Sequence, residues 1–125
     1  MALPNDIVHP PYNLHLLPPI CLPHLRGYLF FSPLDVEYFE AENNISWVFT
    51  AGSPGKYIIS VRLHQIEESL CGPLFCRIHK SFIVCLRHVR EMDPDKTSIM
   101  LDNGTWLPIG RAYQKQFLER MIFCK

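Results

Sequence analysis

An excess of charge of either sign is missing from this 125-residue sequence, because twelve Lys and Arg balance twelve Asp and Glu. Proteins that bind polyanions through their overall field carry a clear basic surplus, so this class is disfavoured. The halves still differ: residues 1–70 hold three Lys and Arg against seven Asp and Glu, and residues 71–125 hold nine against five. Any nucleic-acid surface should therefore be local and built mainly by the second half, unless these charges are simply solvated.

Long apolar runs are also missing. No segment approaches the roughly 20 apolar residues that a membrane-spanning helix needs, so we expect no membrane partner. The first twenty residues hold five prolines, with neither a basic start nor an unbroken apolar stretch. We therefore expect no signal peptide.

Cysteine is present in an odd number, five, at uneven spacing, which favours reduced thiols in the cytoplasm. Cys76 with His79 and Cys85 with His88 repeat a spacing that some zinc sites use. In strands, however, residues three apart point to opposite faces. We expect packed thiols and no metal or other cofactor, and structural zinc is the alternative.

Sets of residues typical of enzymes are missing too. No nucleophile with a base, no paired acids and no glycine-rich phosphate loop has a convincing spacing. Asp35 and Glu37 would share one face of a strand, but Glu40 and Glu42 flank a turn and fit solvated edges. We expect a protein that is not an enzyme.

What the sequence does contain is enough apolar residues for a core, with 48% hydrophobic and 12% aromatic residues in the length of one domain. Residues 1–17 are rich in Pro, His and Leu and show no periodicity. We expect a tail or linker there and one domain over residues 18–125. The apolar residues of the tail leave open that it docks on the domain or on a second copy.

From Ile20 onward, short aromatic and β-branched runs alternate with turn residues, which predicts a mainly β, antiparallel, multi-sheet fold. We expect strands at about 20–22, 28–31, 36–40, 45–50, 57–61, 76–79, 82–86, 97–101 and 105–109. The Asn103-Gly104 pair predicts a hairpin with a tight type I′ turn, and residues 51–55 should also turn the chain.

Two short helices are predicted from apolar residues at three-to-four spacing. The first runs from Arg62 to Leu70 and is stopped by Gly72-Pro73. The second contains Tyr113 to Met121, with Gly110 at its N-cap. Both stripes fit core packing.

The cations that stand beside a predicted core strand point to nucleic acid. Four of them fall within fourteen residues that contain no carboxylate: Arg77, Lys80, Arg87 and Arg90. Lys80 and Ser81 interrupt the apolar alternation, as expected of a turn with outward side chains. Arg77 offers a fork for phosphate, and Lys80 a mobile point charge. The alternative is that Arg77 pairs with a carboxylate such as Glu67, and that His79 is a hydrogen-bonded structural residue, which we prefer for His79.

Arg111 stands where the last helix should begin, a position at which the helix dipole disfavours a cation by about 0.3–1 kcal/mol. A contact to phosphate or to a guanine edge would explain its placement. The alternative is an exposed arginine without a partner.

Several of these segments together resemble the LytTR family of bacterial DNA-binding domains, over about residues 18 to 123. Residues 35–44 resemble the family's Asp-Ile-x-Tyr-x-Glu-Ala-x-Gly-Asn, and Leu63 to Leu70 resembles its Leu-x-x-x-Glu-x-x-Leu helix. Arg77 to Cys85 resembles its Arg-x-His-Arg/Lys-Ser element followed by Ile-Val-Asn, and residues 103–111 resemble Asn-Gly-x-x-Leu-Pro-Val-Ser-Arg. The departures are Asn43 for Gly, Cys85 for Asn and Gly110 for Ser.

The resemblance implies a β fold whose loops enter successive major grooves of a bent duplex. It implies base reading by Lys80, phosphate contacts by Arg77 and Ser81, a contact by Arg111, and a first contact loop that includes Asn44 and Ser46. The receiver domain usual in such proteins is not in this sequence.

We therefore predict a cytoplasmic, sequence-specific transcriptional regulator that contacts the major groove of double-stranded DNA, binds repeated sites as two copies and can form a homodimer. The alternative is a protein-interaction module on a LytTR-like fold that has lost specific DNA binding.

Overall fold

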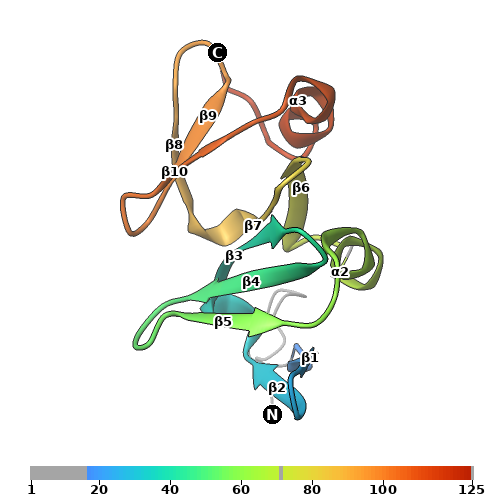
Figure 1. Ribbon diagram of the computed structural model, residues 1–125. Helices are drawn as coiled ribbons and strands as arrows, with labels where there is room; N and C mark the ends of the chain where they lie inside the picture. The colour runs from blue at the N-terminus through green and yellow to red at the C-terminus, as the bar shows by residue number, and fades with distance from the viewer. Residues whose placement is uncertain (1–16, 71, 125) are drawn as a thin grey trace, which may run out of the picture.

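The computed structural model describes residues 17–70 and 72–124, which form three antiparallel sheets and two α-helices (Figure 1). The predicted tail, residues 1–17, lies outside the described residues except for Leu17. The helices are α2 (Leu63–Leu70) and α3 (Arg111–Leu118), with short 3-10 turns η2 (Pro33–Asp35) and η3 (Leu86–His88). The strands are β1 (Ile20–His24), β2 (Gly27–Phe31), β3 (Val36–Glu42), β4 (Ile45–Thr50), β5 (Lys56–Ile59), β6 (Phe75–His79), β7 (Phe82–Cys85), β8 (Val89–Met92), β9 (Ser98–Leu101) and β10 (Trp106–Pro108). The predicted mainly β class with two helices is confirmed.

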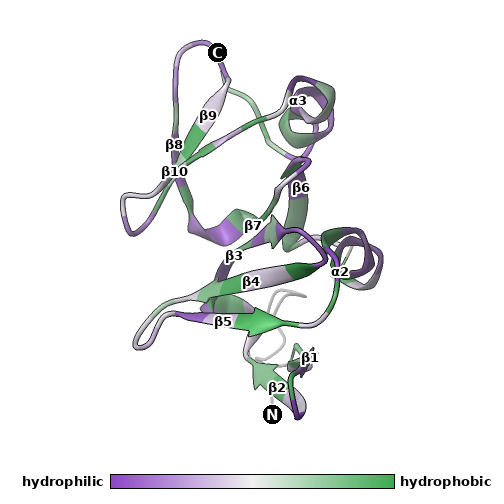
Figure 2. Cartoon of the chain, in the orientation of Figure 1, coloured by the Kyte–Doolittle hydropathy of each residue, from purple (hydrophilic) through white to green (hydrophobic). Residues whose placement is uncertain are grey.

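A five-stranded sheet in the order β5-β4-β3-β7-β6 forms the centre of the fold. Strands β3, β6 and β7 are largely buried on both sides, and their residues alternate between two cores. Phe39 and Ile83 pack with α2 and the β1–β2 hairpin, whereas Tyr38 and Val84 pack with the β8–β9–β10 sheet and α3. Apolar residues are concentrated on the strands, and the turns that join them are more hydrophilic (Figure 2). The cores therefore lie above and below one sheet.

The β9–β10 connection is a hairpin, but it is not the two-residue type I′ turn that we predicted. A type I′ turn needs positive φ at both Asn103 and Gly104, whereas Gly104 has φ +89° and Asn103 is not in that region. The Gly104 N–H donates to the Leu101 carbonyl, and the Leu101 N–H donates to the Thr105 carbonyl, both at 2.9 Å. The loop thus has three residues, with its single left-handed position at the glycine.

Strand β8 was not predicted. Its residues, Val-Arg-Glu-Met, do not alternate between apolar and polar, and its two central positions are exposed. It forms because it pairs with β9, with a register shift between Val89 and Glu91. Among the described residues, no helix is long and apolar enough to cross a membrane.

The β3–β4 turn consists of Asn43 and Asn44, between the paired residues Glu42 and Ile45. Asn43 has φ +56°, in the left-handed region, where glycine is unstrained and asparagine is tolerated better than other residues. This backbone explains why the LytTR pattern resembled here has a glycine at this position.

Replacement of Asn43 tests this strain. We expect Asn43→Val to lower the free energy of unfolding by about 1–2 kcal/mol, because a β-branched side chain is disfavoured at positive φ. Asn43→Gly should leave stability unchanged or slightly higher. Urea unfolding of both variants checks the prediction, and equal stabilities would contradict it.

Candidate nucleic-acid interface

Three segments that were predicted to contact DNA lie along one side of the molecule, together with α2. They are the β3–β4 turn, the β6–β7 turn and the start of α3 (Figure 1). Backbone hydrogen bonds join them: the Ala41 N–H donates to the Ser81 carbonyl at 2.9 Å, and the Gly110 N–H donates to the Ile78 carbonyl at 2.7 Å. We name these three segments, together with α2 and Arg62 immediately before it, the turn row.

Lys80 and Ser81 form the β6–β7 turn, as predicted, and the Lys80 side chain is exposed. Two neighbouring side chains hold the turn. The Ser81 N–H donates to Nδ1 of His79 at 3.0 Å, and Nη2 of Arg77 donates to the Lys80 carbonyl at 2.6 Å. The backbone that carries Lys80 is therefore fixed on both sides of the turn.

Arg77 does not project from the turn. Its side chain is only 11% exposed, and Nη1 donates to Oε1 of Glu67 at 2.8 Å. Nε donates to the His79 carbonyl at 2.8 Å, and the guanidinium carbon lies 5.7 Å from the centre of the Tyr113 ring. The structure thus contains the Arg77–Glu67 ion pair, which the sequence analysis gave as the alternative to a phosphate contact. Arg77 is thus engaged within the protein and poorly placed to meet phosphate.

His79 is a structural residue in this turn, as we preferred from the sequence. Burial lowers its pKa from the ordinary value near 6.5, and the positive charges of Lys80 and Arg77 lower it further. A neutral imidazole can accept the Ser81 N–H at Nδ1, which an imidazolium cannot do. The neutral form of His79 is therefore the form that holds the turn.

The start of α3 is packed directly against this turn. Gly110 is the N-cap, as predicted, with φ −68° and ψ 145°, and Arg111 is the first helical residue and is exposed. A Cβ atom added at Gly110 would lie 3.1 Å from Cδ2 of Tyr113 and 3.4 Å from Cδ2 of His79. The missing side chain lets α3 begin close to His79, so Arg111 and Lys80 emerge from adjoining backbone.

The first contact loop requires a correction. Asn44 is exposed, and its Oδ1 accepts a hydrogen bond from Nη2 of Arg62 at 3.0 Å. Ser46, in contrast, is 0% exposed, and its Oγ donates to the Val61 carbonyl at 2.8 Å. Ser46 belongs to strand β4, where it faces inward, so its predicted contact with DNA is not available in this fold.

Arg62 is an exposed cation of the turn row that the sequence reasoning missed. It stands immediately before α2, and its backbone N–H donates to Oε1 of Gln65 at 2.9 Å, as at a capped helix start. The signal existed in the sequence, because a cation at a helix N-terminus is the argument that singled out Arg111. Arg62 and Asn44 also show that the first half of the chain contributes to this side.

The run of four cations is not one patch. Arg90 Nε lies 3.2 Å from an Asp102 oxygen. The ring nitrogens of His88 lie 2.9 Å from Asp102 Oδ2 and 2.7 Å from the Leu34 carbonyl. Arg87 is exposed on η3, apart from the turn row. Of the four, Lys80 is the cation exposed at the β6–β7 turn.

The paired Cys-x-x-His spacing does not gather ligands. Cys76 lies in the core with α3, and Cys85 lies in the core with α2, on the opposite face of the sheet. Burial raises the pKa of both thiols, that of Cys85 to about 11. Within residues 17–70 and 72–124, no three metal-ligating side chains converge. Cys71 lies outside the described residues.

The family model of the LytTr DNA-binding domain matches residues 26–122. The chain belongs to this family. A solved LytTr DNA-binding domain from Bacillus cereus superposes with a TM-score of 0.70 and 25% identity, over 84% of this chain and 97% of that chain. The superposition therefore covers nearly the whole of the solved LytTr domain.

Curated relatives are transcription and signalling proteins. The LytTR domain is 32% identical over 68 residues to the sensory transduction protein LytT of Enterococcus faecalis, covering 52% of this chain and 28% of the relative. It is 34% identical over 87 residues to the CO-responsive transcriptional regulator RcoM of Rhodospirillum rubrum, covering 66% and 36%. A LytR regulator of Staphylococcus aureus is 30% identical over 78 residues, covering 60% and 31%. This chain thus spans about a third of each relative.

Loss of the Arg77 guanidinium should destabilise the domain. We expect Arg77→Met to lower the free energy of unfolding by about 1–3 kcal/mol, because Glu67 and two carbonyls lose their donors. Arg87→Met is the matched control at an exposed position and should change stability by less than about 0.5 kcal/mol. Urea unfolding measures both, and equal effects would contradict the internal role of Arg77.

His79 should make the domain less stable in acid. Its folded-state pKa is lowered, so its contribution to stability is present above about pH 6.5 and is lost as the pH falls. We expect the free energy of unfolding to drop less between pH 7.5 and 5.5 in His79→Asn than in the parent protein. An unchanged pH dependence would show that His79 is not the responsible group.

Proposed function

We propose that this LytTR domain acts in a transcriptional regulator and recognises a specific duplex sequence by placing the turn row against successive major grooves. The observation that supports this most directly is the junction of the β6–β7 turn with the start of α3. It fixes the backbone of Lys80 and Arg111 while leaving both side chains exposed. Rigid backbone with free cationic tips is what base reading requires.

We assign base reading to Lys80 and Arg111. An arginine can donate two hydrogen bonds to O6 and N7 of guanine, and a lysine can reach the same atoms as a point charge. Ser81 and the free N–H groups at the start of α3 suit phosphate oxygens. We assign Arg77 a positioning role, because its nitrogens already bond to Glu67 and to the turn.

At the other end of the turn row, we assign a phosphate contact to Arg62 and a groove contact to Asn44. Arg62 is exposed, and its Nη2 donates to the Asn44 side chain, so a single phosphate or base edge can be approached by both. The Asn44 amide nitrogen remains able to donate to a base edge.

We further propose that two copies bind repeated sites on double-stranded DNA, in the cytoplasm. A single DNA-binding module buries about 600–1,000 Å² of protein surface, whereas specific complexes reach about 1,000–2,500 Å². Two copies on sites one helical turn apart would supply that area. The second candidate function is a protein-interaction module, which the balanced net charge favours.

Selection from a pool of random duplexes, followed by sequencing, tests the proposal. We expect enrichment of a repeated motif that binds much more tightly than a scrambled control at the same salt concentration. Weak binding that moderate salt abolishes, without enrichment, would instead support the interaction module.

Variants in the turn row should separate base reading from general attraction. We expect Arg111→Ala to weaken binding to the enriched site by about 1–3 kcal/mol and to relax the preference at one base pair. Arg26→Ala removes the same charge from the exposed β1–β2 turn and should have little effect. Fluorescence anisotropy on single-base variants of the site measures both, and equal losses would contradict the assigned role of Arg111.

Arg62→Ala should weaken binding to all duplexes similarly and reduce the slope of log Kd against log salt by about one. This is expected because a phosphate contact carries no sequence information. The same salt titration checks the parent protein and Arg26→Ala, and an unchanged slope would remove Arg62 from the interface.

A further inference from the structure

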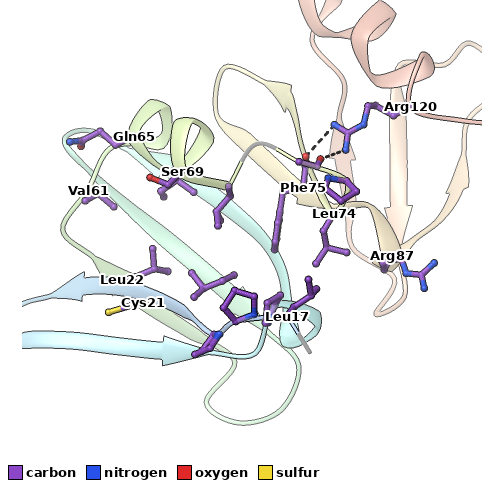
Figure 3. Close-up of a pocket in the computed structure, with 18 of the residues that line it drawn as sticks. Leu17, Cys21, Leu22, Val61, Gln65, Ser69, Leu74, Phe75, Arg87 and Arg120 are labelled. Atoms are coloured by element: carbon purple, nitrogen blue, oxygen red, sulfur yellow. Dashed lines mark hydrogen bonds between the residues drawn. The ribbon is translucent and has the colours of Figure 1, made fainter. Parts of the chain in front are cut away.

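A large apolar groove lies between α2, β1 and the segment that leads into β6 (Figure 3). Its volume is about 1320 Å³, and its walls include Leu22, Ile66, Leu70, Leu74 and Phe75. Sites for small molecules usually enclose about 300–1,000 Å³. The groove is therefore better suited to a segment of polypeptide than to a small ligand.

The charge of the groove limits what can occupy it. Among residues 17–70 and 72–124, its lining contains two arginines, Arg87 and Arg120, and no carboxylate. Arg120 donates to the carbonyls of Phe75, at 3.3 Å, and of Gly72, as drawn in Figure 3. These carbonyls accept two of the five N–H donors of the guanidinium and do not cancel its charge. The matching occupant is mostly apolar and brings a carboxylate.

The chain itself has such a segment next to the groove. Leu17, the first described residue, lines the groove, so the preceding residues are attached at its wall. Residues 1–16 contain one carboxylate, Asp6, and no Lys or Arg. Their apolar residues include Ile7, Val8, Leu14 and Leu16.

We propose that residues 1–16 occupy this groove in the same chain. The prolines of the segment favour extended backbone, which can lie along a groove wall with its side chains directed inward. Direct attachment through Leu17 gives the segment an effective concentration of the order of millimolar, which favours its own groove over that of a second copy.

The location of the groove determines which side of α2 the docked segment would contact. Ile66 and Leu70 of α2 face the groove, whereas Glu67 of the same helix binds Arg77 on the side of the turn row. The segment would thus pack behind α2 and leave Lys80 and Arg111 uncovered.

Photo-crosslinking in the full chain tests the proposal. Ser69 is exposed and lines the groove, so Ser69→benzoylphenylalanine places the probe there without disturbing the core. We expect irradiation to give an intramolecular adduct with residues 1–16, identified by mass spectrometry. Glu68→benzoylphenylalanine, an exposed neighbour outside the groove lining, is the control and should give several-fold less of this adduct.

A mixture of isotopically heavy and light chains separates the possible outcomes. Adducts of a single isotopic mass class support docking within one chain. Adducts of mixed mass would overturn the proposal in favour of a second copy as the occupant. Absence of any adduct with residues 1–16 at Ser69, or equal yields at Ser69 and Glu68, would also overturn it.

Paired substitutions in the segment test which of its side chains make the contact, and ANS fluorescence adds a readout that does not need the probe. Leu14→Asp with Leu16→Asp should reduce the crosslink yield several-fold and increase the fluorescence of the apolar dye ANS. Asn13→Asp with His15→Asp adds the same charges at alternate positions and should retain most of the crosslink. Equal losses in both pairs would contradict a groove contact made by the leucines.

Discussion

The turn row depends on the guanidinium of Arg77. It bonds to Glu67 of α2, to the carbonyls of His79 and Lys80, and lies against the ring of Tyr113 in α3. One side chain thus joins two helices to the β6–β7 turn. Because the Arg77 side chain is only 11% exposed, losing one of these partners would leave a largely buried charge with fewer compensating bonds, which is costly. The geometry of Lys80 is therefore set from inside the protein.

A second constraint comes from the central sheet, whose strands β3, β6 and β7 are largely buried on both faces. Alternate residues of β6 and β7 enter different cores. A one-residue change in strand register would therefore move each side chain into the opposite core. This register places Cys76 and Cys85 on opposite faces, which removes the common site that their similar spacing with His79 and His88 had suggested. It also lets β6 and β7 end together at the turn row.

The sequence predicted those parts of the fold that local patterns determine. Nine strands, both helices and the N-cap at Gly110 followed from periodicity and turn residues. Features that depend on distant partners were missed or, for Arg77, left as an alternative. Strand β8 exists only through β9, the burial of Ser46 depends on the Val61 carbonyl, and the place of Arg77 depends on Glu67, ten residues away. Arg62 was the exception, because the helix-start argument applied to it equally.

The balance of charge and the proposed recognition of DNA are compatible because some of the cations are already paired with groups of the protein itself. Arg77 is bonded within the protein and the exposed Arg90 is paired with Asp102, whereas Arg62, Lys80 and Arg111 are exposed along one side. A few phosphate contacts give weak binding to random duplexes, since each contributes about one to the salt dependence. Discrimination between DNA sequences would then depend on base contacts made by side chains whose backbone is fixed. Under this proposal, the domain gains specificity from the rigidity of its turns more than from the strength of its electrostatic field.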